Sequence, residues 1–116
     1  GKRLVQTFQS ENPPTALVAA NDSSAAFAQW KLRGAGIRVP DEVSLVGFDD
    51  IPLAATTDPP LTTVRVDREA MGRAAVRRLV TLLKSSENNT EALLPPGQYK
   101  LPVTLIERES TRPLMP

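Results

Sequence analysis

Apolar residues in the first half of the chain gather in short runs separated by polar and proline-rich segments. We expect a short helix at 2–9 and then a buried strand at 15–20, because this compact apolar run directly follows a proline pair. Polar N-cap side chains starting at Asn21 predict a helix at 23–33, and a second apolar run predicts a strand at 43–48. A strand, a helix and a strand within about 30 residues form a right-handed crossover, so the two strands are expected to be parallel.

The second half of the chain continues this alternation of elements. We expect a loop at 49–60, an extended segment rich in threonine and valine at 61–66, and a helix at 68–84 with one apolar face. Residues 99–107 have the composition of a strand, and Pro102 places it at the edge or the start of the sheet because proline has no amide hydrogen to donate. The pattern therefore predicts an α/β fold with a parallel sheet and flanking helices.

The helix expected between the first two strands is apolar on two faces. One face carries an apolar stripe whose small residues suit packing on a sheet, namely Ala25, Ala28 and Leu32. The opposite face carries Phe27 and Trp30, two of the few aromatic residues in the chain. Burial within a larger monomer is one explanation, but aromatic residues are enriched in interfaces, so the pattern favours a subunit interface.

Composition narrows the chemistry that the chain can perform. Its 116 residues contain no histidine and no cysteine, which excludes Ser-His-Asp and Cys-His catalysis, disulfides and nearly all zinc sites. The net charge of +1 gives no basic field for nucleic acid, and no apolar run reaches the roughly 20 residues that span a bilayer. We expect a cytoplasmic protein with no catalytic residues, no metal, no cofactor and no membrane partner.

Two polar residues follow the ends of the first two predicted strands. Asn21 and Asp49 occupy equivalent places just past these strands, where open parallel sheets bind their ligands. An amide offers a donor and an acceptor, and a carboxylate offers acceptors, so the pair suits adjacent hydroxyls of a sugar or nucleoside. The alternative is that Asn21 only caps its helix and Asp49 only begins a turn.

The adjacent carboxylates of Asp49 and Asp50 raise the possibility of an enzyme or a magnesium site. Neighbouring residues of an extended segment point in opposite directions, and no further carboxylate cluster accompanies this pair. Neither a P-loop nor a dinucleotide-binding fingerprint is present. The pattern therefore favours ligand binding over catalysis, and a turn-forming role for Asp50 over a contact.

Three segments together are similar to one family of bacterial regulators. Residues 14–22 (PTALVAAND), 36–51 (GIRVPDEVSLVGFDDI) and 59–65 (PPLTTVR) closely resemble the lactose-repressor (LacI/GalR) family of transcription regulators, and 101–111 resembles the closing strand of that family. The order and spacing of the segments agree with the family, and the resemblance covers almost the whole chain. It implies an effector-binding core of the type I periplasmic-binding-protein-like fold.

The resemblance also implies how the chain is organised. The family has an N-terminal helix-turn-helix headpiece, a hinge and a two-lobed core, and this chain resembles only the last part of that core, with the headpiece absent. By resemblance, residues 1–62 and 97–116 belong to the C-terminal lobe, 63–67 cross between the lobes, and 68–96 belong to the N-terminal lobe. Operator DNA is then a partner only through the missing headpiece.

The resemblance assigns roles to individual residues. Asn21 and Asp49 match positions that hydrogen-bond the effector, here expected to be a small polar molecule such as a sugar. Five residues match the dimer interface of the family, which implies a homodimer: Ala26, Trp30, Leu53, Thr56 and Thr57. The alternative function is the sugar-binding receptor of an ABC transporter, which shares this fold.

Overall fold

The computed structural model describes residues 1–87 and 100–114, and the chain divides into two compact units. The first unit contains Gly1–Val66 and Thr104–Pro116, and the second contains Asp67–Val103. The first unit is therefore built from two separate stretches of the chain. It carries every residue that the sequence marks as a candidate for binding.

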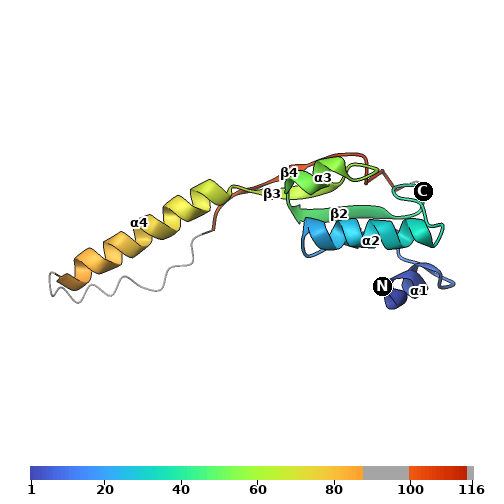
Figure 1. Ribbon diagram of the computed structural model, residues 1–116, viewed down its shortest axis with the longest axis horizontal. Coiled ribbons are helices and arrows are strands. Elements are labelled where there is room, and N and C mark those ends of the chain that lie inside the picture. Colours follow the sequence, from blue (N-terminus) through green and yellow to red (C-terminus); the bar gives the residue numbers. More distant parts are fainter. Residues whose placement is uncertain (88–99, 115–116) are drawn as a thin grey trace. The chain divides into compact units, whose positions relative to one another are not determined.

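A four-stranded sheet has the strand order β1-β2-β3-β4, of which β2, β3 and β4 are labelled in Figure 1. The strands are β1 (Ala16–Val18), β2 (Ser44–Asp49), β3 (Thr62–Val66) and β4 (Val103–Ile106). The first three run parallel, which confirms the predicted crossover. The strand β4 lies at the edge of the sheet and begins directly after Pro102, as expected for a residue that cannot donate to a ladder.

Three helices belong to the first unit: α1 (Lys2–Phe8), α2 (Asp22–Gly34) and α3 (Pro52–Thr56). The helices α1 and α2 confirm the sequence prediction, but α3 lies in the segment that was expected to be a loop. Its proline stands in the first turn, where a fixed φ favours a helix and the missing amide hydrogen has no intrahelical partner to lose. The prediction of an irregular 49–60 segment was therefore wrong for its central residues.

The core lies between the helices and one face of the sheet, and α2 runs alongside β2 in Figure 1. The apolar stripe predicted on α2 is buried as expected, and Ala25 packs in a cluster with Leu45, Ala54 and Leu61. A second cluster joins α1 and the far end of α2 to the segment that leads into β2: Phe8, Leu32, Ile37 and Val43. The other face of α2 stays outside this core.

The second unit is dominated by α4 (Arg68–Glu87), which continues beyond the predicted end at Lys84. Its N-terminus is capped by Asp67, whose Oδ1 accepts a hydrogen bond from the backbone amide of Ala70 at 2.8 Å. Apolar side chains along the helix are exposed, among them Met71, Val76, Leu79, Leu82 and Leu83. The first residue of the strand predicted at 99–107 lies outside the described residues, and the strand itself begins at Val103.

Candidate functional site

Asn21 stands at the carboxyl end of β1 and caps α2. Its backbone is extended, and its Oδ1 accepts a hydrogen bond from the amide of Ser24 at 2.8 Å. The capping role proposed as the simple alternative is therefore real for the side-chain oxygen. Within the described part of the chain, Nδ2 has no hydrogen-bond partner, so the capping geometry still leaves two donors for a ligand.

Asp49 is the last residue of β2 and lies opposite Arg65 of β3 in the sheet register. Its side chain is half-buried, and among residues 1–87 and 100–114 the carboxylate has no hydrogen-bond or ion-pair partner. Because β1 and β2 are parallel and adjacent, Asn21 and Asp49 lie at the same carboxyl end of the sheet, as the sequence predicts. The carboxyl ends of these neighbouring strands thus carry amide donors and carboxylate acceptors that have no partner in the described residues.

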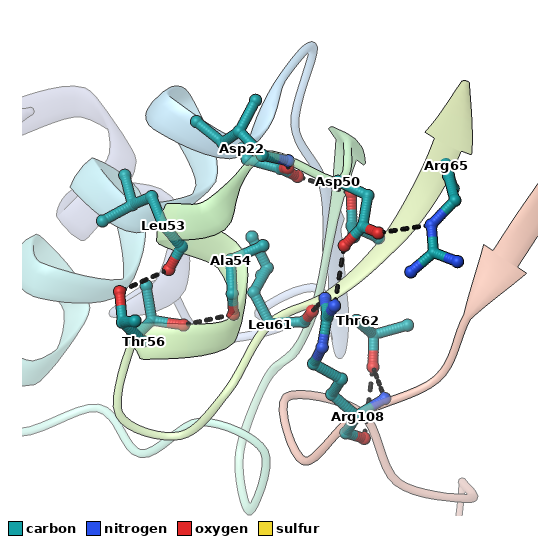
Figure 2. A network of polar contacts seen from close by, with 12 residues as sticks. Asp22, Asp50, Leu53, Ala54, Thr56, Leu61, Thr62, Arg65 and Arg108 are labelled. Atoms are coloured by element: carbon teal, nitrogen blue, oxygen red, sulfur yellow. Dashed lines mark hydrogen bonds and ion pairs between the residues drawn. The ribbon is translucent and has the colours of Figure 1, made fainter. Parts of the chain in front are cut away.

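Asp50 makes two side-chain contacts that the sequence did not predict. Its side chain is only 8% exposed, and its carboxylate accepts from Arg65 Nε at 2.6 Å and from an Arg108 guanidinium nitrogen at 2.7 Å. Figure 2 shows the carboxylate between the two arginines. The sequence favoured a turn-forming role for Asp50 and did not predict these two ion pairs, which use both carboxylate oxygens.

Residues 49–51 at the end of β2 are called the corner, and Arg108 connects it to the segment after β4. Besides the ion pair, its guanidinium donates to the carbonyl oxygen of Leu61 at 2.8 Å, and its backbone amide donates to Thr62 Oγ1 at 2.9 Å (Figure 2). Two residues later, the hydroxyl of Ser110 donates to the Leu45 carbonyl at 2.6 Å and accepts from the amide of Thr62 at 2.8 Å. This segment after β4, which contains Arg108 and Ser110 and is called the returning segment, is therefore fixed to the sheet.

Asp22 supports the same corner from the other side. It is completely buried in the first turn of α2, and its Oδ2 accepts from the backbone amide of Ile51 at 2.8 Å. Its Oδ1 accepts from the hydroxyl of Thr63. The sequence suggested only that Asp22 could cap a helix. Its Oδ1 lies against Gly47, the one residue of β2 without a side chain, and no local sequence pattern indicates this contact.

The pKa of Asp50 is lowered by this environment. Burial raises it, but the hydrogen bonds from Arg108 and then Arg65, together with their positive charges, outweigh burial. A carboxyl whose pKa is lower in the folded than in the unfolded state stabilises the fold above its unfolded pKa of about 3.9, and this contribution is lost as the pH falls through the folded pKa.

We predict that Asp50→Asn lowers the free energy of unfolding by about 2 kcal/mol at neutral pH, because Arg108 then loses a charged partner. The difference between wild type and variant should shrink as the pH falls through the lowered pKa of the wild-type carboxyl, because protonation removes its charge. Urea unfolding curves at several pH values measure this difference. A difference that stays constant with pH would contradict the assigned ion pairs.

The five residues matched to an interface lie on α2, on α3 and just after α3. Trp30 is 62% exposed and Leu53 is 41% exposed, Thr56 is exposed, and Ala26 and Thr57 are half-buried. A shallow hollow brings together Ala26, Trp30 and Thr57. These five residues are named here the α2–α3 surface.

Aromatic side chains extend this surface along α2. The ring centroid of Phe27, which is half exposed, lies 5.9 Å from that of Trp30. The ammonium group of Lys31 stands 4.4 Å from the Trp30 ring centroid. Aromatic side chains of this kind are enriched in protein interfaces.

Neither a metal centre nor a membrane segment is found in the described residues. Residues 1–87 and 100–114 contain no group of three or more acidic side chains placed to hold a metal ion. No helix in these ranges is long and apolar enough to cross a membrane.

Comparison with known proteins identifies the family. The family model of the periplasmic binding protein-like domain matches residues 2–111. The HTH-type transcriptional regulator MalR of Streptomyces coelicolor is 58% identical over 66 residues, which is 57% of this chain and 19% of that protein. The lactose operon repressor of Escherichia coli is 35% identical over 109 residues, covering 91% of this chain and 28% of the repressor. The chain belongs to the LacI/GalR family.

Solved structures of LacI/GalR proteins share the fold. The lac repressor dimer bound to operator and an anti-inducer matches 95% of this chain and 36% of its own, with a TM-score of 0.79 and 32% identity. The CelR–cellobiose complex matches 83% and 28%, with a TM-score of 0.72 and 35% identity. A sucrose-bound LacI-family regulator from Lactobacillus casei matches 95% and 38%, with a TM-score of 0.70 and 29% identity.

This LacI/GalR chain spans only part of its relatives. It covers 19% of the MalR protein and 28% of the Escherichia coli repressor. The named relatives are transcriptional regulators and repressors.

Proposed function

We propose that the chain is the C-terminal portion of the effector-binding and dimerisation core of a LacI-type transcriptional regulator that senses a sugar. The observation that carries this proposal is the Asp49 carboxylate, which has no partner in the described residues and stands at the same carboxyl end of the sheet as Asn21. In this family fold, that edge is where a ligand meets the ends of parallel strands. The role is regulatory and not catalytic.

The chemistry of the edge suits a sugar. The Asp49 carboxylate accepts hydrogen bonds from hydroxyl groups, and the free Asn21 amide hydrogens donate to hydroxyl oxygens. A pyranose ring presents adjacent hydroxyls that can satisfy both at once. The relatives solved with cellobiose and with sucrose support this choice of ligand class. An apolar effector would leave the half-buried carboxylate without a partner, which is costly.

The organisation of the family completes the proposal. Residues 1–62 and 97–116 are assigned to the C-terminal lobe, 63–67 to the crossover, and 68–96 to the N-terminal lobe. The α2–α3 surface is the dimer contact, and operator DNA is bound by a headpiece outside these 116 residues. The protein then works in the cytoplasm, where the operator is.

Regulation follows from having two lobes and two subunits. An effector held between the lobes stabilises one arrangement of them over another, and the dimer transmits this shift to the spacing of two headpieces. The transporter-receptor alternative is not favoured, because the named relatives are transcriptional regulators and repressors. The supporting observation in this chain is again the pair of free polar groups at the sheet edge.

The test is sugar binding by the full-length regulator with Asp49→Asn. The substitution keeps the size of the side chain but replaces a charged acceptor, so binding should weaken about tenfold or more, as expected for the loss of a charge-assisted hydrogen bond. A panel of mono- and disaccharides including sucrose and cellobiose is first screened by thermal shift, and the affinity of the best ligand is then measured by calorimetry.

The matched control is Asp41→Asn, the same change at an exposed aspartate before β2, which pairs only weakly with Arg38 at 3.7 Å. This variant should bind the sugar as wild type does. Unchanged affinity in Asp49→Asn would show that Asp49 does not contact the effector. Failure of every sugar to bind wild type would show that the ligand class is wrong.

A further inference from the structure

The backbone at the end of β2 has an unusual conformation. Asp49 has a φ of 100° and Asp50 has a φ of 49°, so two successive residues with side chains adopt positive φ. This region costs energy for residues other than glycine, and it persists only where the surroundings fix it. The chain therefore needs specific contacts to hold this corner in place.

The carboxylate of Asp50 is the first such contact. Each of its oxygens receives a hydrogen bond from a different arginine, Arg65 on β3 and Arg108 on the returning segment. Arg108 is itself held by the Leu61 carbonyl and by Thr62. The side chain of Asp50 is thus fixed to the sheet from two directions, as Figure 2 shows.

The backbone amide of Ile51 is the second contact, through the buried Asp22. Asp49 is thus paired with Arg65 in the β2–β3 register, and the two residues that follow it, Asp50 and Ile51, are each held by hydrogen bonds. Its own carboxylate has no partner in the described residues. The contacts around Asp49 fix its backbone and leave its side chain available.

We propose that Asp50, paired with Arg108, is a positioning residue for Asp49. Its ion pairs hold the Asp49 backbone at positive φ, and this conformation directs the free carboxylate to the effector. The proposal rests on the proposed function for its ligand. Preorganisation of this kind strengthens binding because the corner need not be ordered when the ligand arrives.

The direct test needs no ligand. In the 116-residue chain, Arg108→Met removes the donors and leaves residues 49–51 unchanged in sequence. NMR coupling constants that report φ should show Asp49 at positive φ in wild type and shifted toward extended values in the variant. Arg38→Met is the control, since it removes an exposed arginine that pairs with Glu42 at 3.1 Å before β2. A positive φ retained in Arg108→Met would overturn the proposal.

The second test separates positioning from general stability by a double-mutant cycle in the full-length regulator. With Asp49 present, Arg108→Met should weaken binding of the best sugar of the panel about tenfold, whereas in the Asp49→Asn background it should change affinity less than about twofold. A purely structural role would weaken both backgrounds equally, and that outcome would overturn the proposal. Arg108→Lys, which keeps one donor, should recover part of the affinity.

Two further outcomes have a defined meaning. If wild type binds no sugar of the panel, the proposed function fails, while the NMR measurement still decides whether Arg108 holds Asp49. If Arg108→Met gives a collapsed spectrum, the same coupling constants are measured in Asp50→Asn, which weakens both ion pairs, and an unchanged positive φ at Asp49 in that variant would overturn the proposal.

Discussion

A Gly47→Ala variant should lose about 3 kcal/mol of unfolding free energy, the largest stability change that we expect for one added methyl group. A Cβ atom at this position would clash with Asp22 Oδ1 and would lie 2.8 Å from Leu61 Cδ2. Neither neighbour is free to move, because Asp22 holds Ile51 and Thr63 and Leu61 is completely buried. Urea unfolding followed by circular dichroism measures the loss.

The control for this prediction is Gly34→Ala. A Cβ at Gly34 meets no atom within 4 Å, and the residue ends α2. This variant should stay within about 1 kcal/mol of wild type, as expected from helix propensity alone. If Gly47→Ala is equally well tolerated, Asp22 can move away from β2, and its role in fixing Ile51 is wrong.

The second large effect is expected on self-association. If the α2–α3 surface is the dimer contact, Trp30→Glu should weaken association at least about 100-fold, which corresponds to a loss near 3 kcal/mol at a central aromatic residue. The variant should keep its fold, because Trp30 is mostly exposed within one chain. Light scattering over a concentration series gives the mass of each variant.

Two controls show which surface is responsible. Leu114→Glu places the same charge at another exposed apolar residue of the first unit, and Leu79→Glu places it on α4. Neither should change the mass if the α2–α3 surface forms the dimer. A wild-type chain that stays monomeric, or a dimer that only Leu79→Glu dissociates, would contradict the assignment.

Local signals explain which parts of the fold could be predicted from the sequence. The parallel pair β1 and β2 and the helix between them follow from two apolar runs and the capping residue Asn21, since each signal lies within a few residues of the element that it defines. The exposed aromatic face of α2 follows from helical periodicity in the same way. Neighbours in sequence were sufficient for these elements.

The features that the sequence did not predict lack such local signals. The helix α3 is five residues long, too short to show periodicity. The ion pairs of Asp50 were missed because one of its partners, Arg108, is 58 residues away, and no local pattern predicts that pairing. Asp22 meets Thr63 across a separation of 41 residues. Polar networks formed by tertiary contact, and the backbone conformation that they hold, need the folded chain.

The fixed returning segment also sets the order in which the protein can fold during its synthesis. Ser110 is completely buried, and it bridges Leu45 and Thr62, which leave the ribosome many residues earlier. Contacts that join distant parts of the chain form late. Until 104–112 is made, Asp50 lacks its partner Arg108 and the edge of β3 is exposed to other chains. A nascent chain of this protein is therefore most vulnerable to aggregation, and most in need of chaperones, while the second unit is being translated.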